Sequence, residues 1–166
     1  PGILSLFALL ILIKPLIVNM ANNNISFLVF SISILLIYLL SSFIYNIQGT
    51  NDWESRVSTN NLTILVSHLF FTGTYPLFPW ITFAVVGAFL GSSITEGGKT
   101  LPRNNTTLLL IIIGVCYCLF TLISANVTGS IWAHPTEGQY LNFFPANIGF
   151  LIGSMTGVFI LSLIHI

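Results

Sequence analysis

The sequence predicts an all-α integral membrane protein with about five transmembrane helices and one short interfacial or re-entrant helix. Three observations predict this class. First, 55% of the 166 residues are hydrophobic and 5% are charged, whereas a soluble domain carries roughly 25% charged residues. Second, the mean hydropathy is +0.97. Third, the apolar residues form continuous runs of roughly the 20 residues that a helix needs to cross hydrocarbon, without the alternation of a half-buried strand.

Five apolar runs have the length of a membrane span. We expect transmembrane helices over residues 2–20, 25–45, 75–93, 107–124 and 146–164. In lipid a helix satisfies its own backbone groups, so continuous apolar runs favour helices. The run 62–72 is too short to span, and we expect it to form a surface or re-entrant helix that carries His68.

The charge balance narrows the functional classes. Four Lys and Arg residues stand against four Asp and Glu residues, and the formal net charge is zero. Such a chain lacks the basic patch that neutralises phosphates, so we expect no nucleic-acid partner. The composition also excludes a soluble enzyme, a disordered tail and a coiled coil. A chain of this length is expected to form one membrane domain in contact with a lipid bilayer. Homo-oligomerisation is left open.

Both ends of the chain are unusual for natural termini. Pro1 leads directly into an apolar run, and the last six residues, Leu161–Ile166, resemble the translated start of a sequencing adapter. We therefore expect residues 1–161 to be a membrane-domain fragment of a longer protein and residues 162–166 to be an artefactual tail. A genuine short C-terminus is the alternative.

The basic residues near span ends predict the orientation in the membrane. Lys99 and Arg103 are half of all basic residues and lie in the loop 94–106, which we therefore place in the cytoplasm. The connections 46–73 and 126–145 then lie outside. We expect the membrane to be the plasma membrane of a prokaryote.

Lys14 is the one charged residue within a predicted span. A charge at that depth costs at least ~2.5–3.5 kcal/mol on insertion scales, so it needs a partner, a cavity or a route to the interface. Lys14 either snorkels past Met20 towards the interface or faces a polar cavity and meets an anionic group. Pro15 follows it and favours a kink.

The most specific stretch is the entry to the third span. Pro76 and Pro79 fix the start of the helix, and Gly73 permits a sharp turn before it. Tyr75 and Trp80 have the amphipathic rings that suit the headgroup interface. These two side chains therefore form either an aromatic belt or the rim of a mouth for a cofactor or sugar.

Other polar residues give weaker signals. His68 is a weak candidate for a general base that assists an amine or hydroxyl in attacking a thioester, although a structural or solvated role is the more common one for such a residue. Asp52, Glu54 and Arg56 are expected on a solvated outer loop, and the alternative is that the acids orient a sugar.

No metal site is expected from this sequence. His68 and His134 are scattered and lack the spacing of a ligand set. Cys116 and Cys118 lie two apart in an apolar run, so on a helix they point in different directions and favour neither a disulfide nor a metal pair.

Two segments carry a resemblance to a known family. Tyr75–Trp80 and the apolar run after it, up to Gly87–Gly91, resemble a segment of the heparan-α-glucosaminide N-acetyltransferase family. Phe143–Asn147, which opens the last span, is similar to the entry found in bacterial and archaeal relatives, and Gly2–Leu4 resembles the helix that follows the family's first catalytic section. As a pattern of spans the resemblance covers most of residues 1–160.

The resemblance implies part of a membrane acyltransferase that moves an acetyl group from cytosolic acetyl-CoA to an extracytoplasmic sugar or glycan. Lys99 and Arg103 would then meet the phosphates of CoA, unless they only anchor the topology. The family's Arg/Asp-rich helix start and His-bearing outer loop are absent, so the resemblance transfers no catalytic residue to this chain. The alternative is a non-catalytic small membrane subunit or a transporter fragment.

Overall fold

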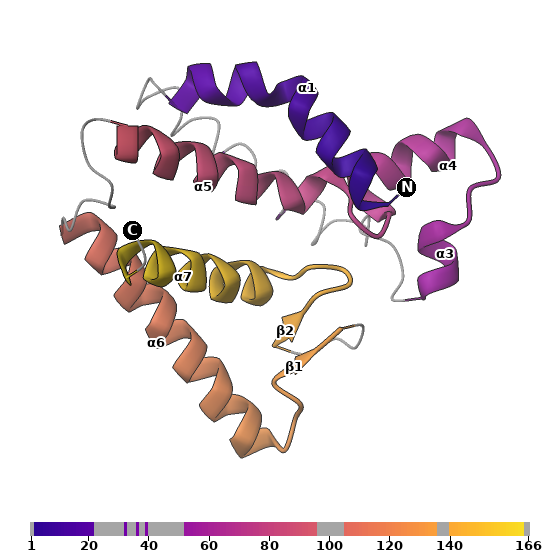
Figure 1. Cartoon of the computed structure of the whole chain (residues 1–166). Coiled ribbons are helices and arrows are strands. Elements are labelled where there is room, and N and C mark those ends of the chain that lie inside the picture. Colours follow the sequence, from indigo (N-terminus) through magenta and orange to yellow (C-terminus); the bar gives the residue numbers. More distant parts are fainter. Residues whose placement is uncertain are drawn as a thin grey trace. The chain divides into compact units, whose positions relative to one another are not determined.

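The computed structural model describes residues 2–21, 32, 36, 39, 52–95, 105–135 and 140–164 (Figure 1). Its elements are α1 (Ile3–Ala21), α3 (Trp53–Val57), α4 (Leu62–Ser67), η1 (His68–Thr72), α5 (Leu77–Thr95), α6 (Asn105–Thr128), β1 (Ala133–His134), β2 (Leu141–Asn142) and α7 (Ile148–Ile164). η1 is a π-helix. The chain divides into two compact units, residues 1–92 and 93–166.

Most of the expected elements are present. The first, third, fourth and fifth expected spans correspond to α1, α5, α6 and α7, with ends that differ by a few residues. The short helix expected over 62–72 is formed by α4 and η1 together. Most of the expected span 25–45 lies outside the described residues. The tail 162–166 lies partly outside them.

The count of about five spans is not confirmed. Within the described ranges, α1 and residues 107–128 of α6 are long and apolar enough to cross a membrane. The helical segments 62–72 and 77–92 meet at a bend of 44° and together could form a third span, either broken or re-entrant. Helix α7 is apolar but has only 17 residues.

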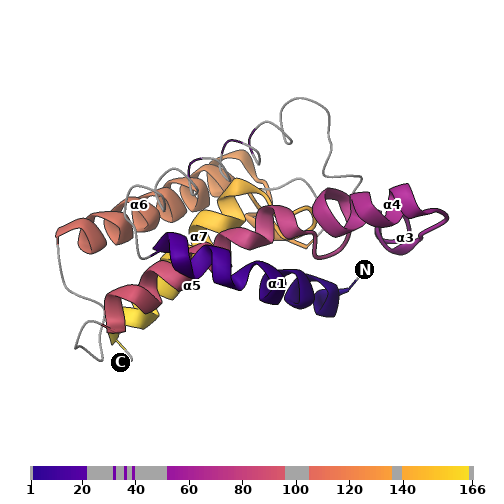
Figure 2. The same cartoon turned by 90° about the horizontal axis from the view of Figure 1, so that it is seen from above.

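In the first unit, α1 packs along α5. Figures 1 and 2 show the two helices side by side and running in the same direction. Their contact buries a small core composed of Leu6 and Ile17 from α1 and Leu77, Ile81 and Val85 from α5. The three α5 residues recur every four positions, which places them on one face of the helix.

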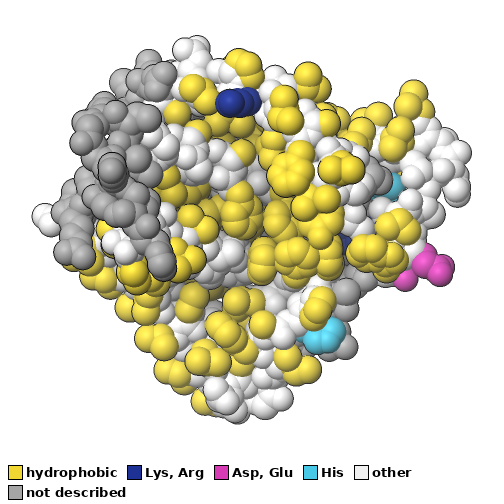
Figure 3. Space-filling model, viewed as in Figure 1, with side chains coloured by type: hydrophobic (Ala, Val, Ile, Leu, Met, Phe, Trp, Pro, Cys, Tyr) yellow, Lys and Arg dark blue, Asp and Glu magenta, His cyan; other side chains and the backbone are white. Residues whose placement is uncertain are grey.

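Much of the hydrophobic surface stays uncovered. Leu4 and Leu12 of α1 are 79% and 75% exposed, and Phe120 of α6 is 68% exposed. Hydrophobic side chains are spread widely over the face in Figure 3, and few charged ones are seen among the described residues. Such a surface would associate in water, but it is the ordinary surface of a protein whose solvent is lipid.

In the second unit, α6 and α7 pack through small residues. Gly114 of α6 lies directly against the Thr156 side chain of α7. Gly149 of α7 lies against the backbone carbonyl of Tyr140, in the connection just before β2. A short parallel pair, β1 with β2, connects the two helices. Trp132, just before β1, donates a hydrogen bond from Nε1 to Thr121 Oγ1 of α6 at 3.1 Å, which ties this connection to the helix.

Candidate functional site

The segment of residues 52–80, called the elbow from this point, leads into α5. Each of its two short α-helices begins at a capping residue. The Asp52 carboxylate accepts from the backbone N–H of Ser55 at 3.0 Å, and Asn61 Oδ1 accepts from that of Ile64 at 2.8 Å. These side chains satisfy backbone donors that the first turn leaves free. The local sequence therefore supplies the start signal of both helices.

The elbow bends between η1 and α5. Gly73 ends η1, and its N–H donates to the His68 carbonyl at 3.1 Å. A Cβ atom at this position would collide with that same carbonyl oxygen, so the close approach requires glycine. Phe78 then interrupts the helical geometry with φ −98° and ψ 120°, as expected for a residue that precedes proline. Its peptide bond to Pro79 is cis.

Arg56 is buried inside the elbow, contrary to expectation. Its side chain is 2% exposed, and Nη1 donates to the carbonyls of Gly73 at 3.0 Å and Thr72 at 3.3 Å. Burial lowers the pKa of the guanidinium through desolvation, although a guanidinium stays charged in proteins. The interpretation of Arg56 as a solvated cation is therefore wrong. The physical reason is that the C-terminal carbonyls of a helix lack partners within it and attract a cation.

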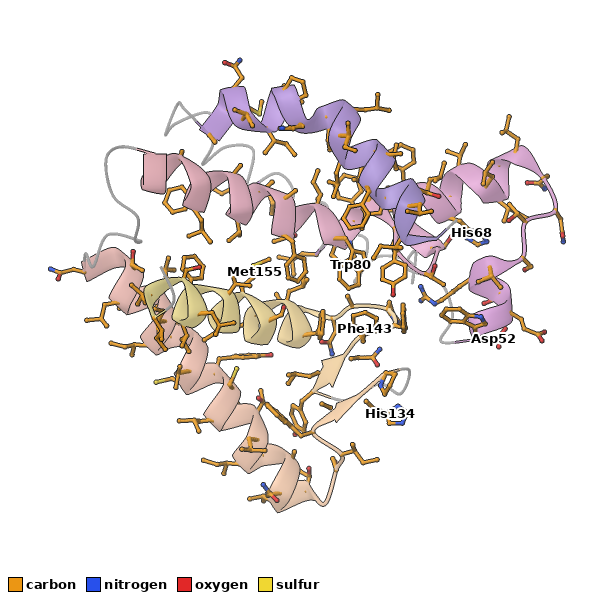
Figure 4. The ribbon with its side chains drawn as sticks, viewed as in Figure 1. Asp52, His68, Trp80, His134, Phe143 and Met155 are labelled. Atoms are coloured by element: carbon orange, nitrogen blue, oxygen red, sulfur yellow. The ribbon has the colours of Figure 1, made fainter. Side chains whose placement is uncertain are left out.

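Asp52 and Glu54 differ from Arg56 in their exposure. Both acidic residues are exposed, as expected for the outer loop. Asp52 nevertheless has a defined role, because its carboxylate caps α3. Figure 4 shows Asp52 at the α3 end of the elbow and His68 further along it.

His68 is also buried, with 5% of its surface exposed. Its Nδ1 lies 2.6 Å from Thr72 Oγ1, and its Nε2 lies 3.0 Å from the Ser58 carbonyl oxygen. Since a carbonyl only accepts, Nε2 carries the hydrogen, and in a neutral ring Nδ1 accepts from the Thr72 hydroxyl. Ser67 Oγ lies 3.1 Å from the same hydroxyl and can donate to it. Nε2 thus ties η1 to Ser58 in the chain before α4, and Nδ1 makes its contact within η1.

The two aromatic residues predicted to act together do lie together. The rings of Tyr75 and Trp80 are 5.5 Å apart, and Trp80 stacks on Phe83 with its ring 5.6 Å away. Tyr75 and Trp80 are both half-buried. A second stacked pair, Phe71 with Phe78, spans the bend at 5.6 Å. The elbow therefore presents a cluster of rings at the start of α5, with Trp80 labelled in Figure 4.

Lys14 lines a pocket of about 310 Å³ in the first unit. The other lining residues are all hydrophobic: Phe7, Leu10, Ile11, Ile17 and Val18 from α1, and Ala84 and Ala88 from α5. One of the two expectations for Lys14 was a polar cavity. The cavity beside Lys14 is instead apolar, because the same face of α1 that carries the lysine otherwise carries only the packing residues of a membrane helix.

The entry to α7 contains two asparagines to which the sequence analysis assigned no structural role, although Asn147 ends the segment Phe143–Asn147 of the family resemblance. Asn147 Oδ1 accepts from the backbone N–H of Phe150 at 2.8 Å and from that of Asn142 at 3.1 Å. The Asn142 amide in turn donates to the carbonyls of Phe144 at 3.0 Å and Pro145 at 3.1 Å. The position of Asn147 directly before an apolar run is the N-cap signal that could have identified it.

Two of the predicted site residues, Lys99 and Arg103, lie outside the described residues. His134 is half-buried on β1, in the second unit, whereas His68 belongs to the first. Within the described ranges, no three His, Cys, Asp or Glu side chains gather as metal ligands would.

Comparison with known protein families gives a match over most of the chain. A family model described as heparan-alpha-glucosaminide N-acetyltransferase, catalytic, matches residues 2–118. This range contains α1, the elbow and α5, and it ends within α6. No curated protein and no solved structure matches the chain. The Phe143–Asn147 segment, which also contributed to the resemblance, lies beyond the matched residues.

Proposed function

Because the chain belongs to the catalytic family of heparan-alpha-glucosaminide N-acetyltransferases, we propose that it forms part of a membrane enzyme that transfers acetyl groups from cytosolic acetyl-CoA to an extracytoplasmic sugar. The observation that carries this proposal is the match over residues 2–118. The apolar helices of that range support it, since a donor and an acceptor on opposite sides require a protein within the bilayer.

The proposed reaction is an acyl transfer. The sugar amine attacks the thioester carbonyl, the new C–N bond forms, the C–S bond breaks, and CoA leaves as its thiol after taking up a proton. The protein's contribution is to hold thioester and amine close together and to accept the amine proton with a general base. Lys99 and Arg103 are proposed to bind the CoA phosphates from the cytoplasmic side.

We propose a positioning role for His68 in place of the catalytic one. A general base needs a nitrogen lone pair that can reach the acceptor, and both nitrogens of His68 already face Thr72 and Ser58 within hydrogen-bond distance. Its burial points the same way. His68 then keeps η1 in place, and η1 leads into the ring cluster at Tyr75 and Trp80, where we propose that the acceptor enters.

The test is acetyl transfer by the complete protein that contains this sequence, reconstituted in vesicles. Acetyl-CoA labelled in its acetyl group is added on one side, and an oligosaccharide ending in an α-glucosaminide is enclosed on the other. We expect label to accumulate on the enclosed sugar. Labelled sugar on neither side, with folded protein in the vesicles, would contradict the proposal.

Trp80→Ala tests the acceptor entry in the same assay. We expect at least a tenfold loss of transfer, whereas Trp80→Phe keeps a ring on Phe83 and retains most of the activity. Phe120→Ala on α6, which removes an exposed ring, is the matched control. Unchanged acetyl transfer by Trp80→Ala would contradict a role in acceptor entry and leave the ring cluster as an aromatic belt at the membrane interface.

One observation favours a second candidate function. The bend of 44° between the helical segments 62–72 and 77–92 is a broken span or re-entrant loop, and broken helices mark the substrate sites of many transporters. A transporter would carry the unmodified sugar into the vesicles without acetyl-CoA. Uptake of unlabelled sugar in the absence of the donor would therefore support transport rather than transfer.

A further inference from the structure

The pocket between α1 and α5 has an unusual combination of a lysine and an apolar lining. Its seven other lining residues are hydrophobic. Phe7, Ile11 and Val18 are each more than 40% exposed, so the pocket opens along the side of α1 to the surroundings. Ala84 and Ala88, one helical turn apart on α5, leave the space because their side chains are short.

The position of Lys14 along α1 makes snorkelling difficult. Helix α1 has 19 residues, or about 28 Å of rise, close to the roughly 30 Å thickness of hydrocarbon. A helical side chain leaves the backbone tilted towards the N-terminus, and that end lies about 16 Å from Lys14. The nearer end at Ala21 is about 10 Å away but in the opposite direction. The amine therefore lies below the headgroup level, where a charge needs a counter-ion that is drawn inward from the interface.

The described part of the unit supplies no such counter-ion at the pocket. Its acidic residues are Asp52 and Glu54, and neither lines the pocket. An occupant that suits both the lysine and the lining must carry a negative group at one end and a long apolar chain at the other. The lining extends from Phe7 to Val18, about 16 Å along α1, which is long enough to hold much of an acyl chain.

From this geometry we propose that the pocket between α1 and α5 binds an anionic phospholipid of the surrounding membrane, with one acyl chain along α1 and the phosphate paired with the Lys14 amine. The predicted topology strengthens this assignment. Helix α1 runs in the same direction as α5, whose C-terminal end leads into the loop placed in the cytoplasm. Lys14 then lies nearer the cytoplasmic leaflet, where anionic headgroups attract cations.

The experiment compares lipids in the purified complete protein in mild detergent. Phosphatidylglycerol and phosphatidylcholine with identical acyl chains are added, and bound lipid is counted by native mass spectrometry while the unfolding midpoint is followed by tryptophan fluorescence. We expect the wild type to retain phosphatidylglycerol about tenfold more strongly than phosphatidylcholine, and a larger rise in the midpoint, because a charge-assisted contact forms with only the first lipid.

Four variants test the two halves of the site. Lys14→Gln should abolish the preference for phosphatidylglycerol, and Lys14→Arg should keep it. Ala88→Leu fills the pocket and should weaken retention of both lipids, while Gly87→Leu adds the same bulk at a neighbouring exposed position with open space around it and should leave retention unchanged.

Three results would overturn the proposal. The first is equal retention of both lipids by the wild type, and the second is an undiminished preference in Lys14→Gln. The third is stabilisation by acetyl-CoA that depends on Lys14 and displaces the lipid, which would assign the pocket to the acyl donor. None of these readouts requires acetyl transfer, so failure of this inference and failure of the proposed function are distinguishable.

Discussion

Arg56 and His68 are the two polar side chains that give the elbow its shape. Arg56 neutralises the carbonyls at the end of η1, and His68 connects the start of η1 to Ser58. Both residues are buried, so water cannot replace the bonds that they make. A buried acceptor left without a donor costs about 1–3 kcal/mol, and this sets the scale for substitutions here.

Arg56→Met is expected to lower the free energy of unfolding by about 1–3 kcal/mol, because the carbonyls of Thr72 and Gly73 lose the guanidinium donor. Thermal unfolding of the complete protein in detergent, followed by tryptophan fluorescence, measures the change. Glu54→Gln, an exposed neighbour on α3, should change stability by less than about 0.5 kcal/mol. Equal midpoints for the two variants would show that the Arg56 bonds are unimportant.

Gly73→Ala is expected to destabilise the elbow by about 1–3 kcal/mol, because the added methyl group collides with the His68 carbonyl and a backbone atom must move. Gly87→Ala provides the control, since its methyl group enters open space on α5 and alanine is favoured over glycine in a helix by roughly 0.5–1 kcal/mol. The pair should therefore shift the unfolding midpoint in opposite directions. A midpoint for Gly73→Ala at or above the wild-type value would contradict the close approach.

At the scale of elements, the contact between α6 and α7 depends on small residues. Helices in lipid gain little from burying apolar surface, so close backbone approach and packing hold them together. Gly114 provides such an approach, because Thr156 of α7 occupies the space that a side chain would need.

Gly114→Ala should loosen the α6–α7 pair, whereas Gly157→Ala, with nothing within 4 Å of its added methyl group, should not. Removing the obstructing hydroxyl and methyl groups with Thr156→Ala should restore part of the loss. The unfolding midpoints of the two single variants and the double variant give the coupling between positions 114 and 156. Strictly additive effects would mean that the two residues do not contact each other.

For the whole molecule, the elbow and α5 allow two membrane topologies, a broken span and a re-entrant loop. If segments 62–72 and 77–92 form one broken span, residues on either side of the pair lie on opposite faces of the membrane. If they form a re-entrant loop, the two sides coincide. The bend of 44° is compatible with both arrangements, and the cytoplasmic position of the loop 94–106 stays a prediction from its two basic residues.

Cysteine labelling separates these arrangements. After Cys116 and Cys118 are replaced by Ala, we expect Thr59→Cys to react with an impermeant maleimide added from outside intact cells. Gly98→Cys should react only after the membrane is opened, because the basic loop is held in the cytoplasm. Labelling of both positions from the same side would contradict the broken span and indicate a re-entrant loop.

Taken alone, the sequence determined the class of the protein and its family. The scarcity of charge and the length of the apolar runs follow directly from the lipid solvent and its thickness, so α1, α5, α6 and the short helix over 62–72 could be predicted from local pattern. The stretch Tyr75–Trp80 led to a family that the match over residues 2–118 confirms.

Contacts between distant segments set which polar groups meet and what surrounds them. Arg56 contacts residues sixteen and seventeen positions away, and the pocket beside Lys14 joins α1 to a part of the chain about seventy residues further on. Hydropathy and spacing describe neighbours along one helix, but they carry no information on contacts between distant segments. The burial of Arg56, the partners of His68 and the apolar lining around Lys14 all arise from such contacts. For this reason the sequence predicted a solvated Arg56 and left both snorkelling and a polar cavity open for Lys14.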